Sequence, residues 1–206
     1  MQEISLLFQV IILLMSVVIH EVSHGAVANL LGDPTARLKG RLTLNPIVHL
    51  DIFGSIILPT LMALTPGSPI FGWAKPVPYN PANIKGRFGT ALVAFAGPAS
   101  NLLMATLFVV FIRLGIFSGI MAELAGYIVL INLILGLFNL LPVPPLDGSK
   151  VLTPFLPMSI SYRYERFIES LPFLYTTIVI LLFLFVFGDV FFKAVSRLFF
   201  LLVGLS

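Results

Sequence analysis

The chain of 206 residues is rich in apolar side chains: 58% of the residues are hydrophobic, 10% are charged, and the mean hydropathy is +1.06. Soluble domains carry about 25% charged residues, so this composition excludes an ordinary water-soluble domain. The sequence has no cysteine, which excludes disulfides, thiolate metal ligands and a cysteine nucleophile. The formal net charge of +3 comes with no basic-aromatic pattern, so no nucleic-acid ligand is expected.

Four apolar segments are long enough to cross a bilayer as helices, which takes about 17 to 25 residues. They cover residues 4–31, 88–112, 124–146 and 171–187. A weaker segment, 52–64, is broken by Gly54 and Pro59, and we expect a re-entrant or surface-lying piece there. The sequence therefore predicts an all-α polytopic membrane protein with about four to five transmembrane helices.

The connections between these segments carry weaker signals. Polar and apolar residues alternate over 37–44, which predicts a short strand. The proline-rich stretch 71–81 predicts extended chain at the membrane surface, the charged stretch 163–169 a solvated loop, and 190–206 an interfacial helix. No repeat or long linker divides the sequence, so we expect one membrane-embedded domain over 1–206, with its core at about 4–150.

The motif His20-Glu21-Val22-Ser23-His24 interrupts the first apolar segment. A charge at the centre of a membrane helix costs about 2.5–3.5 kcal/mol on insertion scales, so ionisable residues gathered there indicate a function. On a helix, His20 and His24 project from one face, one turn apart, as two ligands of one metal ion would. Glu21 lies next to that face, where a general base could reach an activated water. The motif therefore predicts a zinc hydrolase.

A catalytic zinc ion usually has three protein ligands, so a third must come from elsewhere in the chain. Asp147 follows an apolar helix whose exit contains three prolines between residues 142 and 145, which predicts unwound backbone near membrane depth. Such backbone is tolerated only where it is buried in protein or lines a wet cavity. A carboxylate there is well placed to complete a metal site, although Asp-Gly can also be a simple turn. The other candidates are His49, Asp51, Glu123, Glu165, Glu169 and Asp189.

Together the two motifs resemble those of the site-2 proteases, the M50-type intramembrane zinc metalloproteases. The HExxH sequence of that family matches His20 to His24, and its second motif, which ends in Asp-Gly after prolines, matches Leu141 to Gly148. Similarity at 32–36, 71–78 and 96–101 extends the resemblance over about residues 10–150. The resemblance implies one zinc ion per chain, with His20, His24 and Asp147 as its ligands, and Glu21 as general acid and base. We expect a short form without a PDZ or CBS domain.

Several polar residues have more than one interpretation. The oxyanion formed by attack on a peptide carbonyl needs a donor besides zinc. Asn139 is the first candidate and Asn101 the second, although each also suits an interhelical hydrogen bond. His49 has three interpretations. It forms with Asp51 a pair that supports the metal ligands, it is an alternative ligand, or it is an interfacial histidine that caps residues 50–58.

A shared metal ion constrains the topology. His20 and His24 lie towards the C-terminal end of the first helix and Asp147 at that of 124–146, so an even number of crossings must separate them. Segment 52–64 then does not span, and the N-terminus is outside. We expect the metal nearer the cytoplasmic face of a cell membrane, and this membrane to be a prokaryotic plasma membrane. The positive-inside rule agrees, because one side then receives Arg37, Lys39, Arg41, Lys75, Lys85, Arg87 and Lys150.

Two functions fit these residues. The first is regulated intramembrane proteolysis, in which an endopeptidase cuts transmembrane segments of other membrane proteins within the lipid bilayer. An unwound substrate would then add as a strand to the 37–44 edge. The alternative is a membrane metal transporter or metal-binding protein that uses the same site. Transporters usually show repeats and ionisable residues along a path, whereas here these residues gather at one depth, which favours the protease.

Overall fold

All regular structure in the described residues, which are 6–51, 57, 75–170 and 172–204 of the computed structural model, is helical. Four helices are long and apolar enough to cross a membrane: α1 (Leu6–Leu30), α4 (Gly89–Arg113), α5 (Ile120–Asn139) and α8 (Phe173–Val203). The shorter pieces are α2 (Thr35–Leu38), η1 (Pro46–His49), η3 (Pro81–Asn83), α6 (Asp147–Val151), η4 (Thr153–Phe155) and α7 (Met158–Ser170). The predicted all-α polytopic fold is confirmed.

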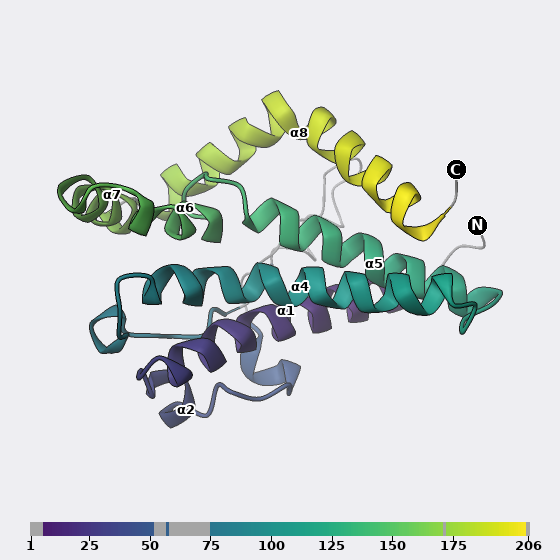
Figure 1. Ribbon diagram of the computed structural model, residues 1–206, viewed down its shortest axis with the longest axis horizontal. Coiled ribbons are helices and arrows are strands. Elements are labelled where there is room, and N and C mark those ends of the chain that lie inside the picture. The colour runs from purple at the N-terminus through teal and green to yellow at the C-terminus, as the bar shows by residue number, and fades with distance from the viewer. Residues whose placement is uncertain (1–5, 52–56, 58–74, 171, 205–206) are drawn as a thin grey trace.

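Helix α4 is the centre of the bundle. It packs along both α1 and α5, and α8 contacts α5 (Figure 1). Small residues bring these helices close, as is common in membranes. A Cβ built on Gly136 of α5 would lie 3.0 Å from the Leu102 side chain and 3.2 Å from the Pro98 carbonyl oxygen of α4. The C-terminal ends of α1 and α5 lie at the same end of the bundle, on the left in Figure 1.

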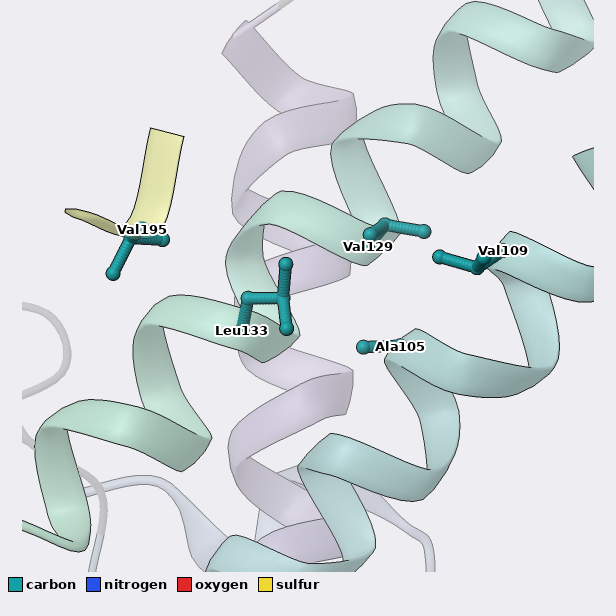
Figure 2. Close-up of a cluster of buried hydrophobic side chains, with 5 residues drawn as sticks. All are labelled: Ala105, Val109, Val129, Leu133 and Val195. Atoms are coloured by element: carbon teal, nitrogen blue, oxygen red, sulfur yellow. The ribbon is translucent and has the colours of Figure 1, made fainter. Parts of the chain in front are cut away.

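An aliphatic cluster holds α4, α5 and α8 together at the other end of the bundle. Figure 2 shows its five buried side chains, which are Ala105, Val109, Val129, Leu133 and Val195. The outward face of α8 is also apolar, with Leu181, Leu182 and Phe185 all more than half exposed. Apolar side chains buried on one side and exposed on the other are expected where the surroundings are lipid. The chain is thus built as a multi-pass membrane protein.

The strand predicted over 37–44 is wrong. This stretch begins in α2 and continues as a turn without a strand. The Asp33 carboxylate accepts hydrogen bonds from the Thr35 N–H and hydroxyl, which favours a helical turn there. The Arg41 guanidinium turns inwards and donates to the carbonyl oxygens of Val48, Lys75 and Pro76. Arg41 is the one buried residue of 37–44, and Leu38 and Leu44 are exposed, so the alternation in the sequence does not mark the two faces of a strand.

Helix boundaries also differ from the prediction. The helix expected over 124–146 runs from Ile120 to Asn139, because the prolines that follow lack the N–H needed to continue it. The expected span 171–187 and interfacial helix 190–206 form one helix, α8. No proline separates them, and Asp189 pairs with Lys193 one turn on, at 2.6 Å. Residues 163–169 are helical, within α7, and not a loop.

The segment 52–64 lies outside the described residues except for Ile57, so the expected re-entrant or surface-lying piece stays a prediction. Of the proline-rich stretch 71–81, residues 75–80 form neither helix nor strand, and η3 follows at Pro81. This agrees with the extended chain that the prolines predict.

Candidate metal centre

Three side chains from two distant parts of the chain meet between α1 and α6. His20 Nε2 lies 3.0 Å from His24 Nε2 and 3.1 Å from Asp147 Oδ2, and His24 Nε2 lies 3.2 Å from the same oxygen. One ligand atom from each residue lies within 4.8 Å of the others. Both histidines are buried, at 7% and 8% exposure. The structure therefore brings together the three residues that the sequence predicts as metal ligands.

The exit from α5 carries Asp147 to this place. Helix α5 ends at Asn139, the chain passes through a short turn, and α6 begins at Asp147 itself. Gly148 fits there because its α-carbon faces the carbonyl groups of Leu140 and Leu141, and a built Cβ would lie 2.5 Å from the Leu141 oxygen. The Asp-Gly pair is thus a packing requirement at position 148 and a chemical one at position 147.

The hydrogen bonds of the two imidazoles direct their free nitrogens at one another. His20 Nδ1 lies 2.6 Å from Asn101 Oδ1, and His24 Nδ1 lies 2.6 Å from the Val93 carbonyl oxygen. These oxygens accept hydrogen bonds, so each Nδ1 carries the proton and each Nε2 a lone pair. Two nitrogen lone pairs and a carboxylate oxygen then face one point. These electron-rich atoms repel one another unless a cation binds between them.

The distances between the ligand atoms and the room beside them also fit a zinc ion. Ligand atoms about 2.0–2.1 Å from a tetrahedral zinc ion lie about 3.3 Å apart, within a few tenths of an ångström of the distances found. Gly97 of α4 leaves room beside them: a Cβ there would lie 2.6 Å from His20 Nε2 and also against His24 Nε2. A side chain at position 97 would occupy the space that a metal ion or its water needs.

Glu21 of α1 is held by the extended segment that contains Val77. Its Oε2 accepts a 2.8 Å hydrogen bond from the backbone N–H of Val77. Arg41 binds the carbonyls of Lys75 and Pro76, and the Lys75 N–H donates to the His49 carbonyl. The Glu21 carboxylate is therefore fixed beside the metal ligands by an extended segment that is itself anchored.

The two asparagines differ in their surroundings. Asn139 ends α5, is partly exposed, and donates from Nδ2 to the Leu135 carbonyl at 2.9 Å. Asn101 is fully buried, accepts from His20, and donates to the Ser16 carbonyl and to Asn132. The amide hydrogens of Asn101 are thus engaged, which leaves Asn139 as the candidate oxyanion donor of the two.

Of the remaining candidates, those whose side chains the structure describes do not join the group of His20, His24 and Asp147. His49 is fully buried and its Nε2 donates to the Thr43 carbonyl at 2.9 Å, in the loop that Arg41 holds. Its Nδ1 has no hydrogen-bond partner among the described residues. Glu123 is in the first turn of α5 and Asp189 pairs with Lys193 in α8. The side chains of Glu165 and Glu169 lie outside the described residues.

Sequence reasoning missed two parts of the site, the Val77 N–H and the pair Ser16 and Asn132 behind Asn101. A backbone donor leaves no trace in a sequence. Asn132 did leave one, because it is a polar residue in an apolar helix two turns before Asn139, and it therefore lies on nearly the same face.

The fold is that of a multi-pass membrane protein, and His20, His24 and Asp147 form a group able to hold a metal ion. The model of Peptidase family M50 matches residues 115–185, which include Asp147. YwhC of Bacillus subtilis, named as a proposed zinc metalloprotease, is 39% identical over 169 residues, covering 77% of this chain and 74% of YwhC. The chain belongs to peptidase family M50, the site-2 protease family, and its relatives' names point to a zinc metalloprotease.

Other relatives carry the same kind of name. Rip2 of Mycolicibacterium smegmatis is 33% identical over 150 residues, which cover 69% of this chain and 55% of Rip2. MJ0611 of Methanocaldococcus jannaschii is 43% identical over 68 residues, 31% of this chain and 35% of MJ0611. Both are named as proposed zinc metalloproteases. No solved structure matches the chain.

Proposed function

We propose that this protein is an intramembrane zinc endopeptidase, with one zinc ion per chain, that hydrolyses peptide bonds in or near transmembrane segments of other membrane proteins. The observation that carries the proposal is the set of lone pairs on His20, His24 and Asp147, directed at one buried point within a bundle of lipid-facing helices. Glu21 lies beside this set and is held there by Val77.

The residues have separate tasks in this chemistry. His20, His24 and Asp147 hold the zinc ion, which when bound supplies a Lewis acid that activates water and polarises a carbonyl. Glu21 takes the proton from the attacking water and passes it to the leaving amine. Asn139 donates its free amide hydrogen to the developing oxyanion. Its place at the end of α5, eight residues before Asp147, supports that role.

The substrate would be a transmembrane helix that has been locally unwound. Backbone hydrogen bonds shield the carbonyls of an intact helix in lipid, so cleavage requires that some of them open. The 37–44 edge is not proposed as the binding place, because that stretch forms no strand.

We place the site nearer the cytoplasmic face of a cell membrane, in a prokaryotic plasma membrane. The support is the basic residues at the metal-bearing end of α1 and α4, because positive charge marks cytoplasmic loops. They lie on the chain between the end of α1 and the start of α4 and are exposed: Arg37, Lys39, Lys75, Lys85 and Arg87.

Glu21→Gln tests the proposal in proteoliposomes that contain a reconstituted single-span substrate. We expect the variant to keep the zinc content of the wild type and to lose cleavage by at least about a hundredfold, the low end of what a general base contributes. A variant that cleaves at the wild-type rate would overturn the role of Glu21. Zinc flux across the vesicle membrane that changes with Glu21→Gln, without any proteolysis, would identify a transporter instead.

A further inference from the structure

A buried polar network joins three helices directly behind His20. Asn101 of α4 and Asn132 of α5 are both 0% exposed, and Ser16 of α1 is 3% exposed. A buried amide is costly unless its hydrogen bonds are made, and more so inside a membrane. Two buried amides and a buried hydroxyl at one contact between apolar helices therefore need a reason beyond packing.

The hydrogen bonds form a chain in which donation runs away from His20, from its ring to Asn101 and from Asn101 to Asn132. Asn132 Nδ2 donates to the Ile128 carbonyl and to the Ser16 hydroxyl, each at 2.9 Å. Asn101 Nδ2 donates to Asn132 Oδ1 at 2.8 Å and to the Ser16 carbonyl at 3.3 Å. Asn101 Oδ1 then lies 2.6 Å from His20 Nδ1.

Two backbone carbonyls fix this direction, because a carbonyl can only accept. The Ile128 carbonyl holds the amino group of Asn132, so the Asn132 oxygen faces α4. The amino group of Asn101 points to that oxygen and to the Ser16 carbonyl, so the Asn101 oxygen faces His20. His20 must then carry its proton on Nδ1, and its Nε2 lone pair faces His24 and Asp147.

We propose that Asn101 and Asn132 are positioning residues for the metal ligand His20: anchored on the carbonyls of Ser16 and Ile128, they select the Nδ1–H tautomer and hold Nε2 towards the metal. The inference rests on the proposed metal site. It differs from a role in helix packing alone, because it assigns the two amides an effect on a ligand atom. Hydrogen-bond partners of ligating histidines typically contribute 10–100-fold to metal affinity.

The tautomer is measurable without any variant of the network. The chain has three histidines, so ¹⁵N spectra of the labelled imidazoles are simple, and single histidine variants assign them. In metal-free wild-type protein in detergent, at a pH where the rings are neutral, we expect His20 to be protonated on Nδ1. A proton on Nε2 of His20 would overturn the proposal.

Zinc affinity, measured by competition with a chelator, tests the two amides. We expect Asn101→Leu to weaken binding about 10–100-fold, and Asn132→Leu to weaken it in the same direction by a smaller factor. Asn101→Asp keeps an acceptor opposite His20 Nδ1, as a carboxylate does in many zinc sites, but it loses the amino group that donates to Asn132 and Ser16. Its zinc affinity should therefore lie between those of wild type and Asn101→Leu. Thr106→Val is the matched control, because Thr106 makes a side-chain bond to Leu102 in α4 but is exposed and outside the network.

The outcomes separate the two levels of the argument. Wild-type affinity in both leucine variants, or an Asn101→Asp variant as weak as Asn101→Leu, would show that the network only packs the helices. A wild-type protein that takes up no zinc would instead overturn the proposed function. The aspartate variant and the wild-type spectra remain decisive if a leucine variant does not fold.

Discussion

The backbone N–H of Val77 donates a 2.8 Å hydrogen bond to Oε2 of Glu21, a residue 56 positions earlier in the chain. Val77 stands between Pro76 and Pro78 and is therefore the one residue of the three with a backbone N–H. Its side chain is buried, at 4% exposure. The bundle supplies the metal ligands, while an extended segment outside it orients the proposed general base.

Removal of that single N–H should impair catalysis but not metal binding. In Val77→Pro the donor is lost, and we expect the cleavage rate to fall by about a hundredfold, because small displacements of a catalytic group cost that much. Zinc content should stay at the wild-type level. Val77→Ala is the control, since it loses side-chain packing but keeps the N–H, and it should retain most of the activity. Equal losses in both variants would assign the effect to packing.

Gly97 tests whether the space between the ligands is needed. A methyl group at this position would lie against both Nε2 atoms, so Gly97→Ala should bind zinc with less than one tenth of the wild-type affinity, as expected when ligands are displaced from their geometry. Gly126→Ala in α5 is the matched control, because its Cβ would make an ordinary contact 3.7 Å from Phe199. The same zinc affinity in Gly97→Ala as in wild type would place the metal elsewhere.

Asp33 joins the end of α1 to the segment that follows Val77. It is fully buried and accepts hydrogen bonds from Thr35, from the Asn83 side chain at 2.9 Å and from the Asn80 N–H at 2.6 Å. Burial by itself raises the pKa of the Asp33 carboxyl, but these hydrogen bonds outweigh it and hold the pKa below its ordinary value. The charged form is thus the one that the fold stabilises.

Asp33→Asn should therefore destabilise the protein in a pH-dependent way. A lowered pKa contributes stability that is complete above the ordinary value of about 3.9 and is lost as the pH falls through the folded value. At pH 7 we expect a loss of about 1–3 kcal/mol, because buried donors lose their acceptor. In thermal unfolding in detergent, the difference between wild type and variant should shrink below about pH 4. A difference that stays constant down to pH 3 would contradict this reading.

The parts of the fold that the sequence predicts depend on local properties. Helices α1 and α4 follow from apolar length alone. The meeting of His20 with Asp147 is an exception, because it joins distant segments and was predicted from the resemblance of two motifs to those of the site-2 proteases. The end of α5 at Asn139 was misplaced because apolar residues continue beyond the point where the prolines stop the helix. The sequence predicts a separate interfacial helix over 190–206 because Lys193 and Arg197 stand among aromatic residues there. In the structure Lys193 pairs with Asp189 within the continuous helix α8.

The parts that the sequence does not predict depend on contacts between distant segments. The stretch 37–44 is a loop because Arg41 reaches the carbonyls of Val48, Lys75 and Pro76. Asn101 appeared suited to an oxyanion, but its amide hydrogens are taken by groups on α1 and α5. In both cases the partners decide the role of the side chain, and all of them except Val48 lie more than 30 positions away.

X-ray absorption at the zinc edge of the purified protein tests the central claim most directly. We predict one zinc ion per chain with two imidazole nitrogens and a carboxylate oxygen at about 2.0–2.2 Å, and a loss of one imidazole contribution in His24→Ala. A spectrum without imidazole scattering, or one that His24→Ala and Asp147→Ala both leave unchanged, would contradict the account.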